Sequence, residues 1–255
     1  MSAAPSSALP GPHAKALAVG AVRRFASLSP LGPRELGFLR DMTASAETAP
    51  PGTVLVDEGE VVTRPRLVLS GWVGRQRLLP DGRRQILGFL LTGDMLGLER
   101  QLRPLSSVRT VALTAVRLAD ATALKSLLAR PEAVLQPLSD ACAASLALEE
   151  ALLLDHVVRL GRQTAYERVA HLLLEFRDRL AAAGLVTGDR YALPLTQETL
   201  ADALGLSMVH VNRTLQQLRR ERLIELRGGV VRLLDPERLA AAADYRPPSP
   251  SIWRA

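Results

Sequence analysis

The chain has 255 residues, 47% of them hydrophobic, which is enough for a buried core and two domains and is unlike the composition of a disordered protein. Its formal net charge of +6 suits a polyanionic partner without requiring one, because nearly all basic residues are arginines and their abundance can reflect base composition alone. The single cysteine, Cys142, excludes an internal disulfide and an iron–sulfur cluster held by four thiolates, and it favours the cytoplasm. No apolar run reaches the ~20 residues that span a bilayer, so we expect no membrane association.

The first half of the chain predicts a β domain. Residues 1–20 are rich in small residues and proline and have no signal-peptide core, so we expect a disordered tail there. Residues 33–42 have helical spacing. From about residue 50 to 120, short segments rich in valine and leucine are separated by turn signals, and Pro80-Asp81-Gly82 marks a hairpin tip. The turn spacing favours a sandwich or small jelly roll.

A helical pattern without internal proline or glycine follows from residue 137 to 160. Leu146, Leu153, Val157 and Leu160 fit a seven-residue repeat, and other leucines lie on other faces. A helix this apolar must contact more than one partner, for which the β domain and a second copy of the chain are candidates. The alternative is a single buried helix in a monomer.

The C-terminal part predicts a second helical run, from 164 to 183, then two close-set helices and a hairpin at 223–234. Gly228-Gly229 supplies the hairpin turn. The Pro-rich segment 244–255 predicts a flexible tail.

The two close-set helices have the form of a helix-turn-helix. Thr196 can cap the first helix, and Ala201 is small where two helices cross. Gly205 permits a tight turn, Ser207 can cap the second helix, and Val211 is the apolar residue expected six positions after the glycine.

The second helix has two distinct faces, because successive residues are rotated by about 100°. Val211, Leu215 and Leu218 lie on one face. The other face carries side chains that bond base edges or phosphates, and its N-terminal residues would reach deepest into a major groove. We predict DNA contacts from Ser207, Met208, Val209, His210, Asn212, Arg213, Gln216, Gln217 and Arg220, with Arg227 on the hairpin. The alternative is an ordinary hydrated amphipathic helix.

The sequence resembles the Crp/Fnr-type bacterial transcription regulators over about residues 25–240. The C-terminal likeness is carried by LTQETLADALGLSMVHVNRTLQQLRRERLIELRGGVVRL, and the N-terminal likeness by GTVLVDEGE, LPDGRRQILGFLLTGDMLG and VALTAVRL. The resemblance implies an α+β fold: a jelly-roll domain like the cyclic-nucleotide-binding β-roll (21–130), a dimerisation helix (131–160) and a winged helix-turn-helix (161–243).

The resemblance also implies a homodimer that binds double-stranded DNA at a near-palindromic promoter site and contacts RNA polymerase. Members closest to the catabolite activator place an Arg-Glu pair just after the cap serine, where this chain has Met208 and Val209. The family's later arginine is matched by Arg213, so we expect Arg213 to be the main base-reading residue.

The same resemblance locates a candidate effector pocket at Gly97, Leu98, Glu99, Arg109 and Thr110. Cyclic-nucleotide-binding members have a Gly-Glu pair here for the ribose and a later arginine for the cyclic phosphate. In this chain Leu98 follows the glycine, so Glu99 comes one place late. Counted back from the strand VALTAV, the arginine place falls near Ser106, three residues before Arg109; the strand fixes register better than a loop does.

We therefore expect the effector to be unknown or changed, with cyclic AMP or cyclic GMP sensing as the alternative. We expect neither haem nor metal: His13, His156, His171 and His210 are the available histidines, and none is placed as a clear ligand. No P-loop, GxSxG, HExxH or CxxC motif is present, so we expect no enzyme activity. A ligand-binding module whose helix-turn-helix contacts protein is the remaining alternative.

Overall fold

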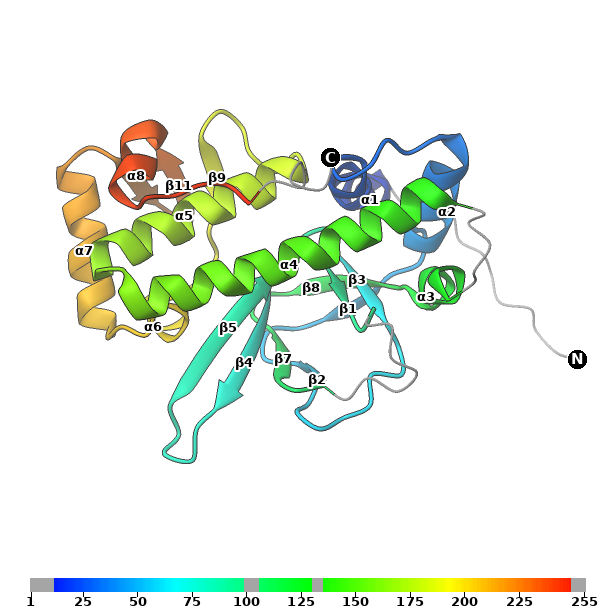
Figure 1. The fold of residues 1–255 in the computed structure, drawn as a ribbon, viewed down its shortest axis with the longest axis horizontal. Helices are drawn as coiled ribbons and strands as arrows, with labels where there is room; N and C mark the ends of the chain where they lie inside the picture. The colour runs from blue at the N-terminus through cyan, green and yellow to red at the C-terminus, as the bar shows by residue number, and fades with distance from the viewer. Residues whose placement is uncertain (1–11, 99–105, 130–134, 249–255) are drawn as a thin grey trace, which may run out of the picture.

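The computed structural model describes residues 12–98, 106–129 and 135–248. They form a β-roll, a long helix and a C-terminal helical domain (Figure 1). The long helix, α4 (Gln136–Arg162), crosses the whole molecule, with the strands of the β-roll along one side and the C-terminal domain around its far end.

The β-roll consists of two four-stranded antiparallel sheets, in the orders β1-β8-β3-β6 and β2-β7-β4-β5. Its core contains valines and leucines from both sheets, including Val68, Val73 and Leu118. This arrangement confirms the predicted fold class. The strands are β1 (Glu47–Ala49), β2 (Val54–Val56), β3 (Arg66–Ser70), β4 (Val73–Leu78), β5 (Arg84–Leu90), β6 (Met95–Leu96), β7 (Arg109–Ala112) and β8 (Val116–Asp120).

The β4–β5 hairpin turns where the sequence predicted. Leu78 pairs with Arg84, and the Leu79 N–H donates to the Arg83 carbonyl at 2.8 Å. Gly82 has φ 85°, a conformation that glycine adopts without a Cβ clash.

The N-terminal prediction is wrong for residues 12–20. Helix α1 (Pro12–Ala26) begins well inside the segment expected to be disordered; residues 1–11 lie outside the described part. Alanine and leucine favour helix, and Ala21 and Phe25 anchor this one in the core. Two further helices, α2 (Pro33–Thr43) and α3 (Thr122–Leu128), complete the N-terminal domain.

Helix α4 is followed by α5 (Ala165–Ala182), which runs back beside it (Figure 1). The break is Gln163–Thr164, where Thr164 caps α5 together with Glu167. Helix α4 continues through Gly161 to Arg162, so the predicted border after residue 160 is two residues early. None of the described helices is long and apolar enough to cross a membrane.

The C-terminal domain is a winged helix. A three-stranded sheet in the order β10-β11-β9 packs with the helices, and Gly228-Gly229 form the predicted turn of the wing. The predicted flexible tail is wrong at Tyr245, which is buried and donates a hydrogen bond to Asp178 at 2.9 Å; residues 249–255 are not described. The elements are α6 (Gln197–Leu204), α7 (Met208–Arg220), α8 (Pro236–Ala242), β9 (Arg190–Ala192), β10 (Ile224–Arg227) and β11 (Val230–Leu233).

Candidate DNA-binding surface and effector pocket

The turn between α6 and α7 has the geometry that its sequence predicts. The Thr196 hydroxyl accepts from the Thr199 N–H at 3.0 Å, and the Ser207 hydroxyl accepts from the His210 N–H at 3.3 Å, so both helices are capped. Gly205 lies between them with φ 61° and ψ 37°. These local bonds fix the start of α7 relative to α6.

Helix α7 has one buried and one exposed face, as predicted. Val211, Leu215 and Leu218 are buried in the core of the domain. Met208 and Val209, in the first turn, are 55% and 68% exposed although they are apolar. Figure 1 shows α7 at the edge of the molecule, at the C-terminal end of α4.

The other side chains predicted to contact DNA also reach the surface. Asn212 is half-buried, and the remaining residues are exposed: Ser207, His210, Arg213, Gln216, Gln217, Arg220 and Arg227. Asn212 donates to Gln197 at 3.1 Å and Gln217 to Glu221 at 2.9 Å. Arg213 makes no side-chain hydrogen bond or ion pair with any residue that the structure describes, which leaves its guanidinium available.

Two contacts that the sequence did not predict hold the helix-turn-helix on α5. Arg168 donates to the Leu204 carbonyl at 3.0 Å, at the end of α6. The Tyr166 hydroxyl donates to the Glu221 carboxylate at 2.5 Å, at the end of α7. Both donors lie in the first turns of α5, so α5 sets the orientation of the exposed helix.

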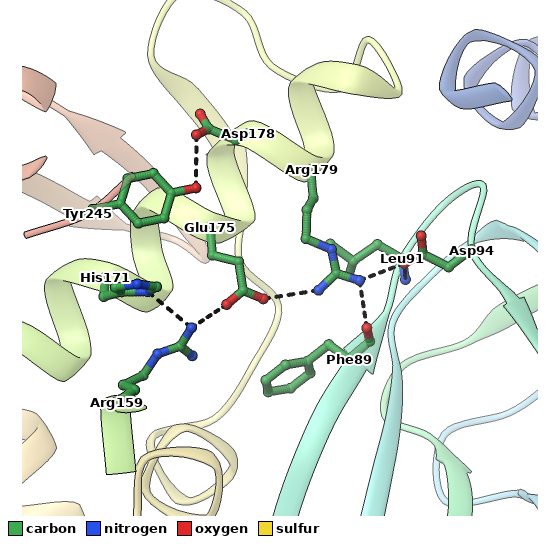
Figure 2. Close-up of polar contacts among 9 residues, drawn as sticks. All are labelled: Phe89, Leu91, Asp94, Arg159, His171, Glu175, Asp178, Arg179 and Tyr245. Carbon is green, nitrogen blue, oxygen red and sulfur yellow. Dashed lines mark hydrogen bonds and ion pairs between the residues drawn. The ribbon is translucent and has the colours of Figure 1, made fainter. Parts of the chain in front are cut away.

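A buried chain of charged groups joins the C-terminal domain to α4 and the β-roll (Figure 2). Arg159 of α4 is paired with Glu175 of α5 and also contacts His171 Nδ1 at 3.0 Å. Glu175 is paired with Arg179 at 3.1 Å, and Arg179 reaches Asp94 of the β-roll at 2.6 Å. All five side chains are at least nine-tenths buried.

The pKa values of these buried charged groups follow from burial and pairing. Burial alone would raise the pKa of Glu175, but Arg159 and Arg179 lower it below its ordinary value, so the carboxylate is charged. Burial, and then the charge of Arg159, lowers the pKa of His171 to about 4. The imidazole is therefore neutral at neutral pH and accepts from Arg159.

The domains match two family profiles, the Crp-like helix-turn-helix domain at residues 167–242 and the cyclic nucleotide-binding domain at residues 46–130. The chain is 35% identical over 224 residues to the transcriptional activatory protein AadR of Rhodopseudomonas palustris, across 88% of this chain and 91% of that protein. It belongs to the Crp/Fnr family of transcription regulators.

Other relatives agree with this assignment. The nitrogen fixation regulation protein FixK of Bradyrhizobium diazoefficiens is also 35% identical, across 88% of this chain and 92% of that protein. The solved structure of FixK2 from Bradyrhizobium japonicum superimposes with a TM-score of 0.66 at 30% identity, covering 78% of this chain and 96% of that one. The protein is thus a DNA-binding transcription regulator of the Crp/Fnr type.

Within this Crp/Fnr fold, a cavity of about 490 Å³ lies between the β-roll, α4 and α5. Ser106 and Thr110 line the cavity, whereas Arg109 turns away from it: its guanidinium binds Asp57 through two contacts of 2.8 Å. The Ser106 hydroxyl donates to the Val108 carbonyl at 2.6 Å. Of the predicted pocket pair, Thr110 therefore lies in the cavity wall and Arg109 does not.

Gly97 and Leu98, two of the predicted pocket residues, do not line the cavity. Leu98 is buried in the hydrophobic core with Met95 and Leu124. Gly97 has φ 80° and lies against Val62, and Glu99 falls outside the described residues. The prediction is therefore wrong for Leu98, because its apolar side chain packs inward.

His156 of α4 and His171 of α5 are both buried. Among the described residues, no cluster of three or more histidine, cysteine or acidic side chains has the arrangement of a metal site.

Proposed function

We propose that the protein acts as a homodimer that binds a near-palindromic promoter site, each copy placing α7 in one half-site. The observation that supports this most directly is an apolar stripe along α4. Four neighbouring residues there, Leu153, Leu154, Val157 and Val158, are between 50% and 60% exposed. A contiguous apolar surface of this kind is typical of an interface rather than of a hydrated face.

The position of the stripe also suits DNA recognition. It lies in the C-terminal half of α4, close to the winged helix (Figure 1). Pairing two copies of α4 in parallel, about a two-fold axis that runs along the helices, would present two copies of α7 at the same end of the dimer. Dimeric helix-turn-helix proteins read half-sites roughly 34 Å apart, one turn of DNA.

For the effector, we propose that neither cyclic AMP nor cyclic GMP is recognised. Arg109 is paired with Asp57 outside the cavity, and a serine occupies the position where the family pattern places its arginine. A cyclic-nucleotide-responsive regulator remains the second candidate function, supported by the family profile matched at residues 46–130. Calorimetry with both nucleotides distinguishes the two, since micromolar binding would establish the second candidate.

We further propose that the protein works in the cytoplasm through contact with RNA polymerase, without catalysis and without an iron–sulfur, haem or metal cofactor. Its one cysteine, Cys142, is buried, and burial raises the pKa of the thiol to about 12, which disfavours a redox or ligand role.

The test of the proposed function is selection from a randomised palindromic DNA library, followed by fluorescence anisotropy with the enriched site. We expect two copies of the chain per site and an affinity that decreases with salt concentration. Binding of one copy per site would contradict the homodimer. Equal affinity for the selected site and for scrambled DNA would contradict sequence-specific recognition.

A further inference from the structure

We propose that Val209 recognises the 5-methyl group of one thymine in each DNA half-site. Val209 is the second residue of α7, which begins at Met208. The inference deepens the function proposed above and rests on its placement of α7 in a half-site. It assigns part of the base specificity to an apolar contact rather than to hydrogen bonds.

The first turn of α7 presents apolar side chains to solvent. Val209 is 68% exposed, more than any other large apolar side chain that the structure describes, and its neighbour Met208 is 55% exposed. Single exposed apolar residues are common on protein surfaces. Here two are adjacent, and they lie in the part of the helix that reaches deepest into the major groove in helix-turn-helix complexes. We therefore expect DNA to cover them.

Val209 lies on the side of α7 that faces away from the protein. Val211 and Leu218 are buried in the core of the domain. Because successive residues turn by about 100°, Val209 and Arg213 project from the opposite side. These two residues are four positions apart, so they are separated by about 6 Å along the helix axis. Successive base pairs are about 3.4 Å apart, so the two side chains reach base pairs about one or two steps from each other.

The polar side chains nearest to Val209 are bonded within the protein. The Ser207 hydroxyl contacts His210 Nδ1 at 3.0 Å and accepts from the His210 N–H at 3.3 Å. Asn212 donates to Gln197 at 3.1 Å, which ties it to α6. These bonds engage the polar groups beside Val209, so its apolar side chain is the group presented at the start of the helix.

An apolar side chain distinguishes thymine from the other bases in the major groove. Thymine presents a methyl group there, whereas adenine and guanine present the N7 acceptor and cytosine presents an amino donor. A valine that covers N7 or the amino group removes water without supplying a hydrogen-bond partner, which is unfavourable. A valine that covers the methyl group buries apolar surface of both molecules, which is favourable.

Deoxyuridine tests the contact, because its replacement of thymine removes only the methyl group. Each thymine of the selected site is replaced singly, and fluorescence anisotropy gives the affinity of the full-length protein. We expect one sensitive thymine, about one or two base pairs from the guanine whose preference is relaxed in Arg213→Ala. Uracil there should weaken binding about fourfold in one half-site and about fifteenfold in both, the effect of one and two buried methyl groups.

Val209→Ala separates a direct contact from a change in DNA flexibility. Its shorter side chain withdraws from the base, so uracil should then weaken binding at most about 1.5-fold. The salt dependence should stay as in the wild type, because no charge is lost. Val19→Ala is the matched control, since Val19 is 45% exposed on α1: here uracil should still weaken binding about fourfold.

A second test uses 5-methylcytosine, which presents the same methyl group on a different base. The sensitive T·A pair is changed to C·G, and the cytosine is then methylated. We expect methylation to strengthen binding of the wild type about fourfold and to have little effect on Val209→Ala.

Three results would overturn the inference: a selected site without thymine within about two base pairs of that guanine, unchanged affinity with uracil at every position, or an equal loss in the wild type and Val209→Ala. The last result would assign the effect to DNA flexibility. Failure of the proposed function is distinguishable, because it would appear with unmodified DNA, as equal affinity for selected and scrambled sequences or as one copy per site.

Discussion

Arg213 and Arg219 are both exposed on α7, but they lie at different positions along the helix. Arg213 is in the N-terminal half, which enters the groove in helix-turn-helix complexes, and Arg219 is in the last turn. We expect Arg213→Ala to cost about 1–3 kcal/mol of DNA-binding free energy and to relax the preference at one base position per half-site.

Competition anisotropy with single-base variants of the selected site measures this effect. Arg219→Ala is the matched control: we expect it to weaken binding to all sequences about equally and to reduce the salt dependence. A uniform loss for Arg213→Ala as well would show that Arg213 contacts phosphate rather than a base.

Glu175 lies between two buried arginines, so its removal would leave both without their full complement of negative charge. We expect Glu175→Gln to reduce the free energy of unfolding by about 3–5 kcal/mol, measured by urea denaturation. Glu225→Gln breaks a half-exposed pair with Arg232, at 3.7 Å, and should cost only about 0–1 kcal/mol. Similar losses of unfolding free energy in the two variants would show that a buried ion pair contributes no more to stability here than an exposed one.

Because His156 and His171 are buried in their neutral form, we predict that the protein loses stability in acid. Their folded-state pKa values of about 4 lie below the ordinary 6.5, so between these values the unfolded chain binds protons that the folded chain does not. The free energy of unfolding should therefore fall as pH decreases from 6.5 to 4. We expect a declining urea midpoint in this window and a shallower decline in His171→Gln. Equal slopes in the two proteins would contradict the assignment.

Single residues differed in how far the sequence determined their role. Ser207 and Arg213 lie on the exposed side of the helix-turn-helix, as predicted, because cap position and helical periodicity are encoded locally. The roles of Arg159 and Glu175 could not be predicted, since the two residues lie on different helices, α4 and α5, and an arginine-rich composition hides a buried arginine among solvated ones. The orientation of Arg109 depends on Asp57, 52 residues earlier in the chain.

At the scale of elements, the short turn between α6 and α7 fixes where the exposed helix begins, and contacts from α5 hold it in place. Gly205 has a positive φ of 61°, and an added Cβ would lie 3.3 Å from the Leu160 side chain. We expect Gly205→Ala to destabilise the protein by about 1–3 kcal/mol, as a lower midpoint of thermal unfolding. Gly161→Ala, in α4 with nothing within 4 Å, should leave the midpoint unchanged or raise it. A fall of equal size in both would contradict a strained turn.

Elements with strong local signals were predicted well, and elements that depend on distant contacts were not. The caps at Thr196 and Ser207 and the turns at Gly82 and Gly228 are encoded within a few residues. Helix α1 was missed because its small residues look like those of a tail. Its stability depends on burial of Ala21 and Phe25 in a core assembled from other segments.

At the scale of the whole molecule, the exposed stripe of α4 determines whether the chain acts alone. Val157 is 60% exposed, and we expect Val157→Asp to yield monomers in sedimentation velocity and to weaken operator binding strongly, because two half-sites are then no longer bound together. Leu78→Asp, on a side chain 48% exposed at the β4–β5 hairpin, should keep the wild-type sedimentation coefficient. A wild-type protein that sediments as a monomer would contradict the dimer directly.

The buried charged chain has a consequence for how the protein would change state. Arg159, Glu175, Arg179 and Asp94 hold three parts of the molecule at fixed separations, and each charge is satisfied only when its neighbours are in place. A small rotation of α5 would leave charges buried without partners, so intermediate orientations are disfavoured and well-separated arrangements are preferred. The protein would therefore occupy a small number of discrete arrangements, and any change of state would alter the fraction of molecules in each arrangement rather than the position of α5 by small degrees.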